Sequence, residues 1–221
     1  MTHRGPIALD GPVASGKTTV GRGVAQTLGW AFIDTGLLYR AVGLLALRAN
    51  LEDWNNDAVA RLAQQSEMAI DDTRVTVDGE DVSDVIGSID AGSAASRVAV
   101  LSDVRRVLVP MQRNMAEQAD GRVVMVGRDI GTVVLWDAPV KIYLDASAEA
   151  RARRRYIEAV ERGEDSNYDR VLSELRERDK RDAERADSPL KPAEDAHVLL
   201  TDSLTPQQVI EKVLRLAEPP S

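Results

Sequence analysis

Short apolar runs recur along the chain, and turn or cap residues bound each of them. The runs lie at 7–10, 31–34, 123–126, 140–145 and 197–200. Near-continuous apolar runs of this length are typical of strands buried on both faces of a sheet. The stretches between them have helical patterns, at about 17–28, 36–49, 88–118 with a break near Ser102, 147–162, 168–186 and 206–217. Strands that alternate with helices predict an α/β fold with a parallel sheet and right-handed crossovers.

Residues 68–86 depart from this alternation. Val75, Val77 and Val82 alternate around Asp78-Gly79, and an Asp-Gly pair is a strong signal for a tight hairpin. The pattern predicts a small antiparallel lobe inserted between the second helix and the third core strand. A hairpin that only decorates the surface is the alternative.

Two further segments mark helix ends. Thr205 followed by Pro206 combines an N-cap with a first-turn proline, which predicts the start of the last helix. The sequence GEDSN at 163–167 separates two Arg-rich helical patterns. It is either a mobile hinge or lid tip, or an ordinary loop between two helices.

The composition narrows the functional class. The 221 residues fit one domain, 43% of them are hydrophobic, and the formal net charge is −8. With 4% aromatic residues and an acidic balance, a general nucleic-acid binder is disfavoured. The chain has no cysteine and no apolar stretch that approaches the roughly 18 residues of a membrane span. We therefore expect a cytoplasmic protein without a membrane partner.

Arginine is distributed unevenly along this acidic chain. The sequence has 23 Arg against 5 Lys, and ten of these Arg fall between Arg151 and Arg185. Arg151, Arg153, Arg154 and Arg155 repel one another unless an anion binds or acids intervene. GC-rich coding accounts for part of the surplus, but the concentration points to anionic ligands.

The segment Gly11 to Thr18 matches the pattern G-x-x-x-x-G-K-[ST] in full, directly after one apolar run and before a helical pattern. In that setting backbone N–H groups converge on phosphate oxygens, Lys17 neutralises phosphate charge, and the Thr18 hydroxyl can bind Mg²⁺. The segment predicts a nucleotide-binding P-loop, against the alternative of a Gly-rich turn. The candidate ATP-binding residues are Gly11, Pro12, Val13, Ala14, Ser15, Gly16, Lys17, Thr18 and Thr19.

Further arginines follow two other predicted strands. Arg40 comes after the strand at 31–34, and Gly127-Arg128-Asp129 comes after the strand at 123–126. Open α/β sheets bind ligands at these strand ends, and Arg recognises phosphate with two parallel hydrogen bonds. The positions indicate a second phosphorylated ligand, with sheet-end salt bridges as the alternative.

Three charged residues near the C-terminal part of the Arg-rich region share one helix face. Arg178, Asp182 and Arg185 have the spacing i, i+4, i+7. A solvated helix with internal ion pairs explains this spacing without any ligand.

Taken in order, these segments resemble one family over nearly the whole chain, the bacterial cytidylate kinases among the nucleoside monophosphate kinases. The resemblance rests on DGPVASGKTT, FIDTGLLYRA, GEDVSDVI, SAASRVAVLSDVRRVLVPMQR, GRDIGTVVLWDAPVKIYLDAS and RERDKRDAERADSPL. The P-loop alone is generic, whereas the ordered set is specific.

The resemblance implies a P-loop NTPase-type three-layer α/β fold with a five-stranded parallel core sheet, a small antiparallel β insert that binds the monophosphate, and a short helical lid. Residues 1–221 would form a single domain, with its core at 1–35, 105–150 and 186–221, the monophosphate-binding region at about 36–104 and the lid at about 151–168. The implied activity is Mg²⁺-assisted transfer of the ATP γ-phosphoryl group to CMP or dCMP, in pyrimidine nucleotide metabolism.

The resemblance also implies roles for individual residues. Arg40, Arg128 and Arg185 would hold the monophosphate, Tyr39, Arg178 and Asp182 would lie around the ribose, and Ser96, Arg105 and Asp129 would read cytosine, with Thr35 as a further substrate-binding residue. Arg151, Arg154 and Arg155 would close over the ATP phosphates. Lys17, Arg128, Arg154 and Arg185 would then neutralise charge in the transition state.

One position departs from the family pattern. The family usually has an acidic residue directly before GRD, where this chain has Val126. Asp34 or Asp129 could replace that acid near magnesium, or Thr18 and the ATP phosphates could suffice because Mg²⁺ keeps several waters.

Two other functions remain as alternatives. One is a small-molecule P-loop kinase that acts on UMP, AMP or shikimate, and the other is a nucleotide-dependent switch. The chain has no N-K-x-D segment for guanine, which disfavours the switch. We expect ATP and CMP or dCMP as the partners, no nucleic acid, and a monomer.

Overall fold

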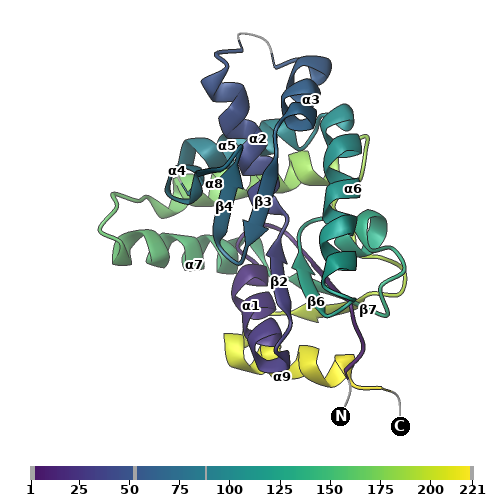
Figure 1. Ribbon diagram of the computed structural model, residues 1–221. Helices are drawn as coiled ribbons and strands as arrows, with labels where there is room; N and C mark the ends of the chain where they lie inside the picture. The colour runs from purple at the N-terminus through teal and green to yellow at the C-terminus, as the bar shows by residue number, and fades with distance from the viewer. Residues whose placement is uncertain (1–2, 52–53, 88, 220–221) are drawn as a thin grey trace.

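The computed structural model describes residues 3–51, 54–87 and 89–219. At its centre lies a five-stranded sheet in the order β2-β6-β1-β7-β8, and every neighbouring pair is parallel (Figure 1). The strands are β1 (Ile7–Asp10), β2 (Ala31–Asp34), β6 (Val123–Val126), β7 (Val140–Asp145) and β8 (His197–Leu200). These bounds confirm the five predicted strands and the predicted parallel sheet.

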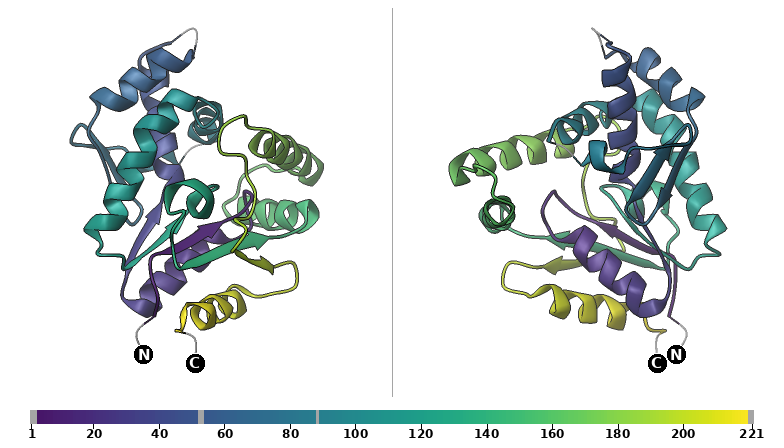
Figure 2. Two further views of the ribbon diagram at one scale, coloured as in Figure 1. Left: turned by 90° about the vertical axis from the view of Figure 1, so that its right-hand side faces the viewer. Right: turned by 60° about the vertical axis from the view of Figure 1, so that its left-hand side comes forward.

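Helices cover both faces of this sheet, which completes three layers (Figure 2). On one face, α1 (Lys17–Leu28) and α9 (Pro206–Ala217) pack against buried side chains of β1, β6 and β7. On the other face, α6 (Ser102–Gln118) and a π-helical turn, η1 (Ile130–Val134), cover Ala8, Ile33 and Met125. The α9 start is confirmed, because Thr205 forms a full capping box with Gln208.

The chain between β2 and α6, residues 36–101, is called the insert from here on, and it has an apolar cluster of its own above the carboxyl ends of the strands. It comprises α2 (Gly36–Arg48), α3 (Asn56–Gln65), β3 (Met68–Asp71), β4 (Arg74–Val77), β5 (Glu80–Asp81), α4 (Ser83–Ile86) and α5 (Ile89–Val98). Asp78 and Gly79 join β4 to β5 and both have positive φ, of 51° and 82°. The hairpin is confirmed, but β3 adds a third strand and Val82 lies beyond β5.

The sequence pattern missed α3, α4 and η1, while the predicted break in the long helix at 88–118 is confirmed between α5 and α6. Ser88, the predicted first residue of that helix, lies outside the described residues. The N-cap of α3 is Asn55, whose side chain accepts a hydrogen bond from the N–H of Ala58. This cap was the local signal that could have identified α3.

Two long helices, α7 (Ala148–Glu161) and α8 (Tyr168–Ala183), form a hairpin that projects from the core (Figure 1). They pack side by side, and Tyr156 meets Tyr168 edge to face with ring centroids 6.4 Å apart. Residues 163–167 form the loop at the outer tip of this hairpin. Because α8 ends at Ala183, Arg185 lies beyond the helix, which corrects the predicted helical face.

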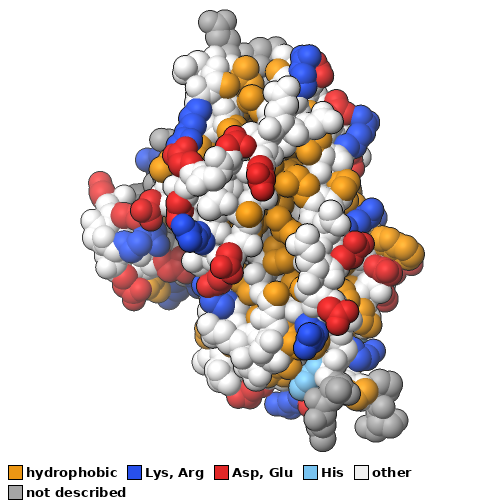
Figure 3. All heavy atoms as spheres, in the orientation of Figure 1, with side chains coloured by type: hydrophobic (Ala, Val, Ile, Leu, Met, Phe, Trp, Pro, Cys, Tyr) orange, Lys and Arg blue, Asp and Glu red, His pale blue; other side chains and the backbone are white. Residues whose placement is uncertain are grey.

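A hollow of about 520 Å³ lies between the insert and the core, and residues of both parts line it. Trp30, Phe32, Ile70 and Met115 contribute to its lining, and Figure 3 shows hydrophobic side chains between the insert strands and α6.

Among the helices of the described residues, none combines the length and the apolar character that a membrane span requires.

Candidate active site

A cleft of about 560 Å³ lies where the carboxyl ends of the core strands face the insert and the helical hairpin. Most of the residues that the sequence nominated line it: Val13, Ala14, Ser15, Gly16, Lys17, Thr18, Thr19, Thr35, Tyr39, Arg40, Ser96, Arg105, Arg128, Asp129, Arg154, Arg155, Arg178 and Arg185. Gly11, Pro12, Arg151 and Asp182 do not line the cleft. The fold thus gathers in one place residues that come from seven separate segments.

The P-loop connects β1 to α1 with a backbone that requires glycine. Gly11 has a φ of 148°, and a Cβ there would lie 2.1 Å from the carbonyl oxygen of Leu144. Gly16 has a φ of 92° and directly precedes α1. The N-terminal N–H groups of α1 therefore face the cleft as an anion-binding site.

Lys17 is the first residue of α1 and is buried, and its Nζ donates to the carbonyl oxygen of Pro12 over 2.7 Å. Burial lowers the pKa of this ammonium well below its ordinary value, and repulsion from Arg128 adds to the shift. A phosphate group in the cleft would compensate both effects, because it supplies negative charge beside the ammonium.

Thr18 and Asp34 place a hydroxyl and a carboxylate side by side in the cleft, and both groups can be metal ligands. The Thr18 hydroxyl donates to Asp34 Oδ2 over 2.9 Å, while Asp34 Oδ1 accepts from the N–H of Gly36 over 3.0 Å. In the sheet, Asp34 on β2 is the direct register partner of Val126 on β6. A carboxylate therefore lies next to the strand end where this chain has valine.

Asp10, the buried last residue of β1, supports the site without lining the cleft, and the sequence analysis missed it. Its carboxylate accepts from the N–H of Ile130 over 2.8 Å and from the N–H of Gly131 over 2.7 Å, which anchors the start of η1 to β1. Burial raises the pKa of Asp10 to about 6, against the opposing effect of these two hydrogen bonds. Its position at the end of an apolar run, directly before the P-loop, was the local signal.

Asp182 organises two arginines from behind the cleft wall. Its side chain is 1% exposed, accepts from Arg128 Nε over 3.0 Å and pairs with Arg185 as well. Burial alone would raise the pKa of Asp182, but Arg128, Arg185 and Arg178 outweigh it and keep the pKa below its ordinary value. Asp182 thus orients the guanidinium groups that line the cleft.

Positive charge accumulates on this side of the cleft. Burial lowers the pKa of Arg178 to about 10, and Arg128, Arg40 and Arg155 add repulsion that Asp182 opposes. Arg40, on α2, donates to the carbonyl oxygen of Ile86 over 2.7 Å. Half-buried arginines that repel one another are best stabilised by an anion.

A pocket at the insert side combines Ser96, Arg105 and Asp129. Arg105 and Asp129 form a buried ion pair, and the Arg105 guanidinium lies 5.7 Å from the centre of the Tyr39 ring. The buried atoms Ser96 Oγ, Tyr39 Oη and Arg105 Nε have no hydrogen-bond partner. Because such groups are costly to bury unpaired, they indicate a polar ligand.

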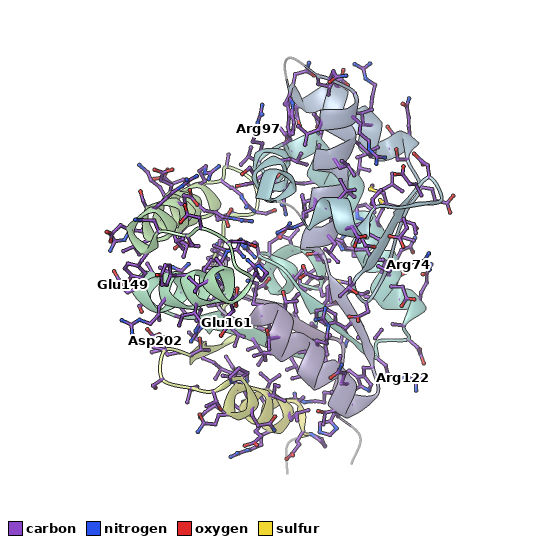
Figure 4. All side chains as sticks on the ribbon, turned by 90° about the vertical axis from the view of Figure 1, so that its left-hand side faces the viewer. Arg74, Arg97, Arg122, Glu149, Glu161 and Asp202 are labelled. Carbon is purple, nitrogen blue, oxygen red and sulfur yellow. The ribbon has the colours of Figure 1, made fainter. Side chains whose placement is uncertain are left out.

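The helical hairpin of α7 and α8 contributes two arginines to the cleft. In Figure 4 the labels Glu149 and Glu161 mark the two ends of α7. Arg154 and Arg155 line the cleft, and Arg154 Nη2 donates to the carbonyl oxygen of Thr201 over 2.5 Å. Arg151 does not join them, because it is buried against Asp179 on α8.

Comparison with known proteins shows the family to which the chain belongs. The family model described as cytidylate kinase matches residues 7–219. The chain belongs to the cytidylate kinase family. It is 45% identical to the cytidylate kinase of Enterobacter sp. over 98% of this chain and 97% of the relative, and 47% identical to that of Agrobacterium fabrum over 90% of each.

Solved structures share the fold of this kinase at low sequence identity. A protein from Eubacterium ventriosum matches with a TM-score of 0.52 at 12% identity, over 95% of each chain. A gluconokinase from Sinorhizobium meliloti matches with a TM-score of 0.50 at 14% identity, over 98% of this chain and 93% of that one. At this identity the likeness extends to the fold alone.

Proposed function

We propose that this cytidylate kinase transfers the γ-phosphoryl group of ATP to CMP and dCMP, which gives CDP and dCDP. The observation that carries the proposal is that the P-loop and a cluster of arginines face each other across one cleft. A phosphate donor and a phosphorylated acceptor would therefore meet end to end, as in-line phosphoryl transfer requires.

ATP would bind on the P-loop side. The N–H groups at the start of α1 and the Lys17 ammonium, which line the cleft, would bind its β- and γ-phosphates. Arg154 and Arg155 approach the same region from α7. These groups would stabilise the charge that develops between donor and acceptor.

CMP would bind on the insert side, with its phosphate among Arg40, Arg128 and Arg185. Cytosine has an N4 donor together with O2 and N3 acceptors. The Asp129 carboxylate, the Arg105 guanidinium and the Ser96 hydroxyl supply the complementary groups in the buried pocket. Tyr39, Thr35 and Arg178 would enclose the ribose between base and phosphate. Asp182, which does not line the cleft, would act on this region only through Arg128 and Arg185.

The residues present fit a magnesium ion, since Mg²⁺ takes hydroxyl and carboxylate oxygens and retains several waters. Thr18 would hold it directly, and Asp34, bonded to Thr18 over 2.9 Å, would hold its water shell. When bound, Mg²⁺ neutralises charge on the β- and γ-phosphates. Asp34 would thus take the role of the acid that the family usually has at the position of Val126.

No covalent intermediate on the protein is needed for this chemistry. Lys17, Arg128, Arg154 and Arg185 would neutralise the charge on the transferred group, and Asp182 would keep two of these arginines oriented. Closure of the arginine-bearing hairpin over the nucleotides would exclude water and suppress hydrolysis of ATP.

A coupled ADP-release assay tests the proposal. We expect release with CMP and dCMP, and much slower release with UMP and AMP. Release with another acceptor but none with CMP or dCMP would overturn the cytosine assignment and favour a different small-molecule kinase.

The organisation into moving parts is also a proposal. We propose a single catalytic domain in which residues 1–35, 105–150 and 186–221 form the core, about 36–104 bind the monophosphate and about 151–168 act as the lid. The insert has an apolar cluster apart from those at the sheet, and α6 contributes Val104 and Leu108 to it. We further propose a monomer in the cytoplasm, to be checked by sedimentation and by cell fractionation.

A further inference from the structure

Arg151 is committed to contacts that a phosphate-binding arginine would not make. Its side chain is 5% exposed. Nε donates to the carbonyl oxygen of Ala146 over 2.9 Å, and Nη1 donates to the carbonyl oxygen of Val13 over 3.1 Å. The two Nη groups also bind both carboxylate oxygens of Asp179, over 3.1 and 2.5 Å. Arg151 thus connects three segments that are distant in sequence.

Two of these segments belong to opposite halves of the cleft. Val13 lies within the P-loop, which faces the ATP phosphates in the proposed function. Asp179 lies on α8 directly after Arg178, and Arg178 lines the side of the cleft proposed for CMP. The Val13 carbonyl and the acceptor-side helix are therefore linked by a single guanidinium group.

The link is stiff for two reasons. A planar guanidinium that makes two parallel bonds to a carboxylate permits little rotation. The Arg151 guanidinium is buried, with Asp179 27% exposed, so the arginine cannot exchange its partner for water at low cost. A displacement of α8 would therefore displace the P-loop carbonyl or break the pair. The exposed ion pair between the same two helices, Arg176 with Glu149, has no contact with the P-loop.

We infer that Arg151 and Asp179 are positioning residues that couple occupancy of the acceptor half of the cleft to the conformation of the P-loop. This inference rests on the proposed function, since it needs two nucleotides in one cleft. A nucleoside monophosphate that engages Arg178 immobilises α8, and the Asp179–Arg151 pair then holds Val13 in the arrangement that accepts ATP. By linkage, ATP must tighten the binding of CMP by the same factor.

Isothermal titration calorimetry of CMP, with and without a saturating non-hydrolysable ATP analogue, tests the coupling. We expect the analogue to tighten CMP binding about 5-fold or more in the wild-type kinase. In Asp179→Asn and in Arg151→Lys we expect this ratio to fall below about 2-fold. Glu149→Gln, which breaks the exposed pair between the same helices, should keep the wild-type ratio.

A merely structural role would give a different result. It would lower the melting temperature of Asp179→Asn and weaken CMP with and without the analogue by one common factor, so that the ratio is retained. A retained ratio in the folded variants overturns the inference, as does a wild-type kinase that binds both nucleotides without coupling. Failure of the wild-type kinase to bind CMP would instead overturn the proposed function itself. If Asp179→Asn does not fold, Arg151→Lys decides the question.

Discussion

Arg105 and Asp129 form an ion pair from which solvent is nearly excluded, with side chains 3% and 6% exposed. Burial raises the pKa of Asp129, and Arg105 is the strongest opposing influence on that pKa. We predict that Arg105→Met lowers the free energy of unfolding by about 3 to 5 kcal/mol, because it leaves a buried carboxylate unpaired. Urea denaturation monitored by circular dichroism measures this loss.

Arg74 is the matched control for this variant. It pairs with Asp81 at the surface of the insert, with side chains 67% and 45% exposed. Arg74→Met should change the free energy of unfolding by no more than about 1 kcal/mol. Equal losses in the two variants would show that burial of the Arg105–Asp129 pair has no special weight.

Lys17 supplies the positive charge closest to the P-loop backbone, where its Nζ lies 2.7 Å from the Pro12 carbonyl oxygen. We predict that Lys17→Met lowers kcat by about 10²- to 10³-fold, the usual effect of removing one donor that stabilises the transition state. Lys212→Met, an exposed change on α9, should keep the wild-type kcat. A Lys17→Met enzyme with wild-type turnover would contradict the proposed role in catalysis.

Asp34 is the carboxylate that we place beside magnesium. We predict that Asp34→Asn weakens Mn²⁺ binding to the kinase–ATP complex by about 10- to 100-fold, the usual effect of losing a group that orients a metal's ligands. Electron paramagnetic resonance of Mn²⁺ measures this binding. Asp71→Asn, at an exposed position on β3, is the control. EDTA should abolish turnover and Mg²⁺ should restore it, and unchanged Mn²⁺ affinity in Asp34→Asn would exclude Asp34 from the site.

Asp10 should make stability depend on pH in an unusual direction. Its pKa rises from 3.8 to about 6 on folding. Between these pH values the folded protein binds more protons at Asp10 than the unfolded protein does, so this carboxyl lowers stability as the pH rises. Relative to Asp10→Asn, the wild-type free energy of unfolding should fall by roughly 2 kcal/mol between pH 4 and pH 7.

Urea denaturation of both proteins across this pH range provides the test for Asp10. The difference between them isolates the titration of one carboxyl, because all other groups titrate in both. A difference that stays constant, or that grows in favour of the wild type as the pH rises, would refute the shifted pKa.

The sequence alone determined the strands of the core, the P-loop, and the arginines that collect at strand ends. Each of these depends on adjacent residues: a strand needs a short apolar run, and the P-loop needs glycines, Lys17 and Thr18 within one turn of chain. The hydrophobic pattern did not predict α3, because the apolar face of this helix is short and its buried residues are Val59 and Ala63.

Only the tertiary structure decided which charged groups meet. The strand order β2-β6-β1 sets Asp34 beside Val126, and it brings Asp10 to the backbone of η1 across 120 residues of sequence. Because α7 packs against α8, Arg151 pairs with Asp179, whereas Arg154 on the same helix lines the cleft. Ion pairs form where folding brings opposite charges together and removes water. The partners are distant in sequence, so no pattern of adjacent residues predicts which charges will meet.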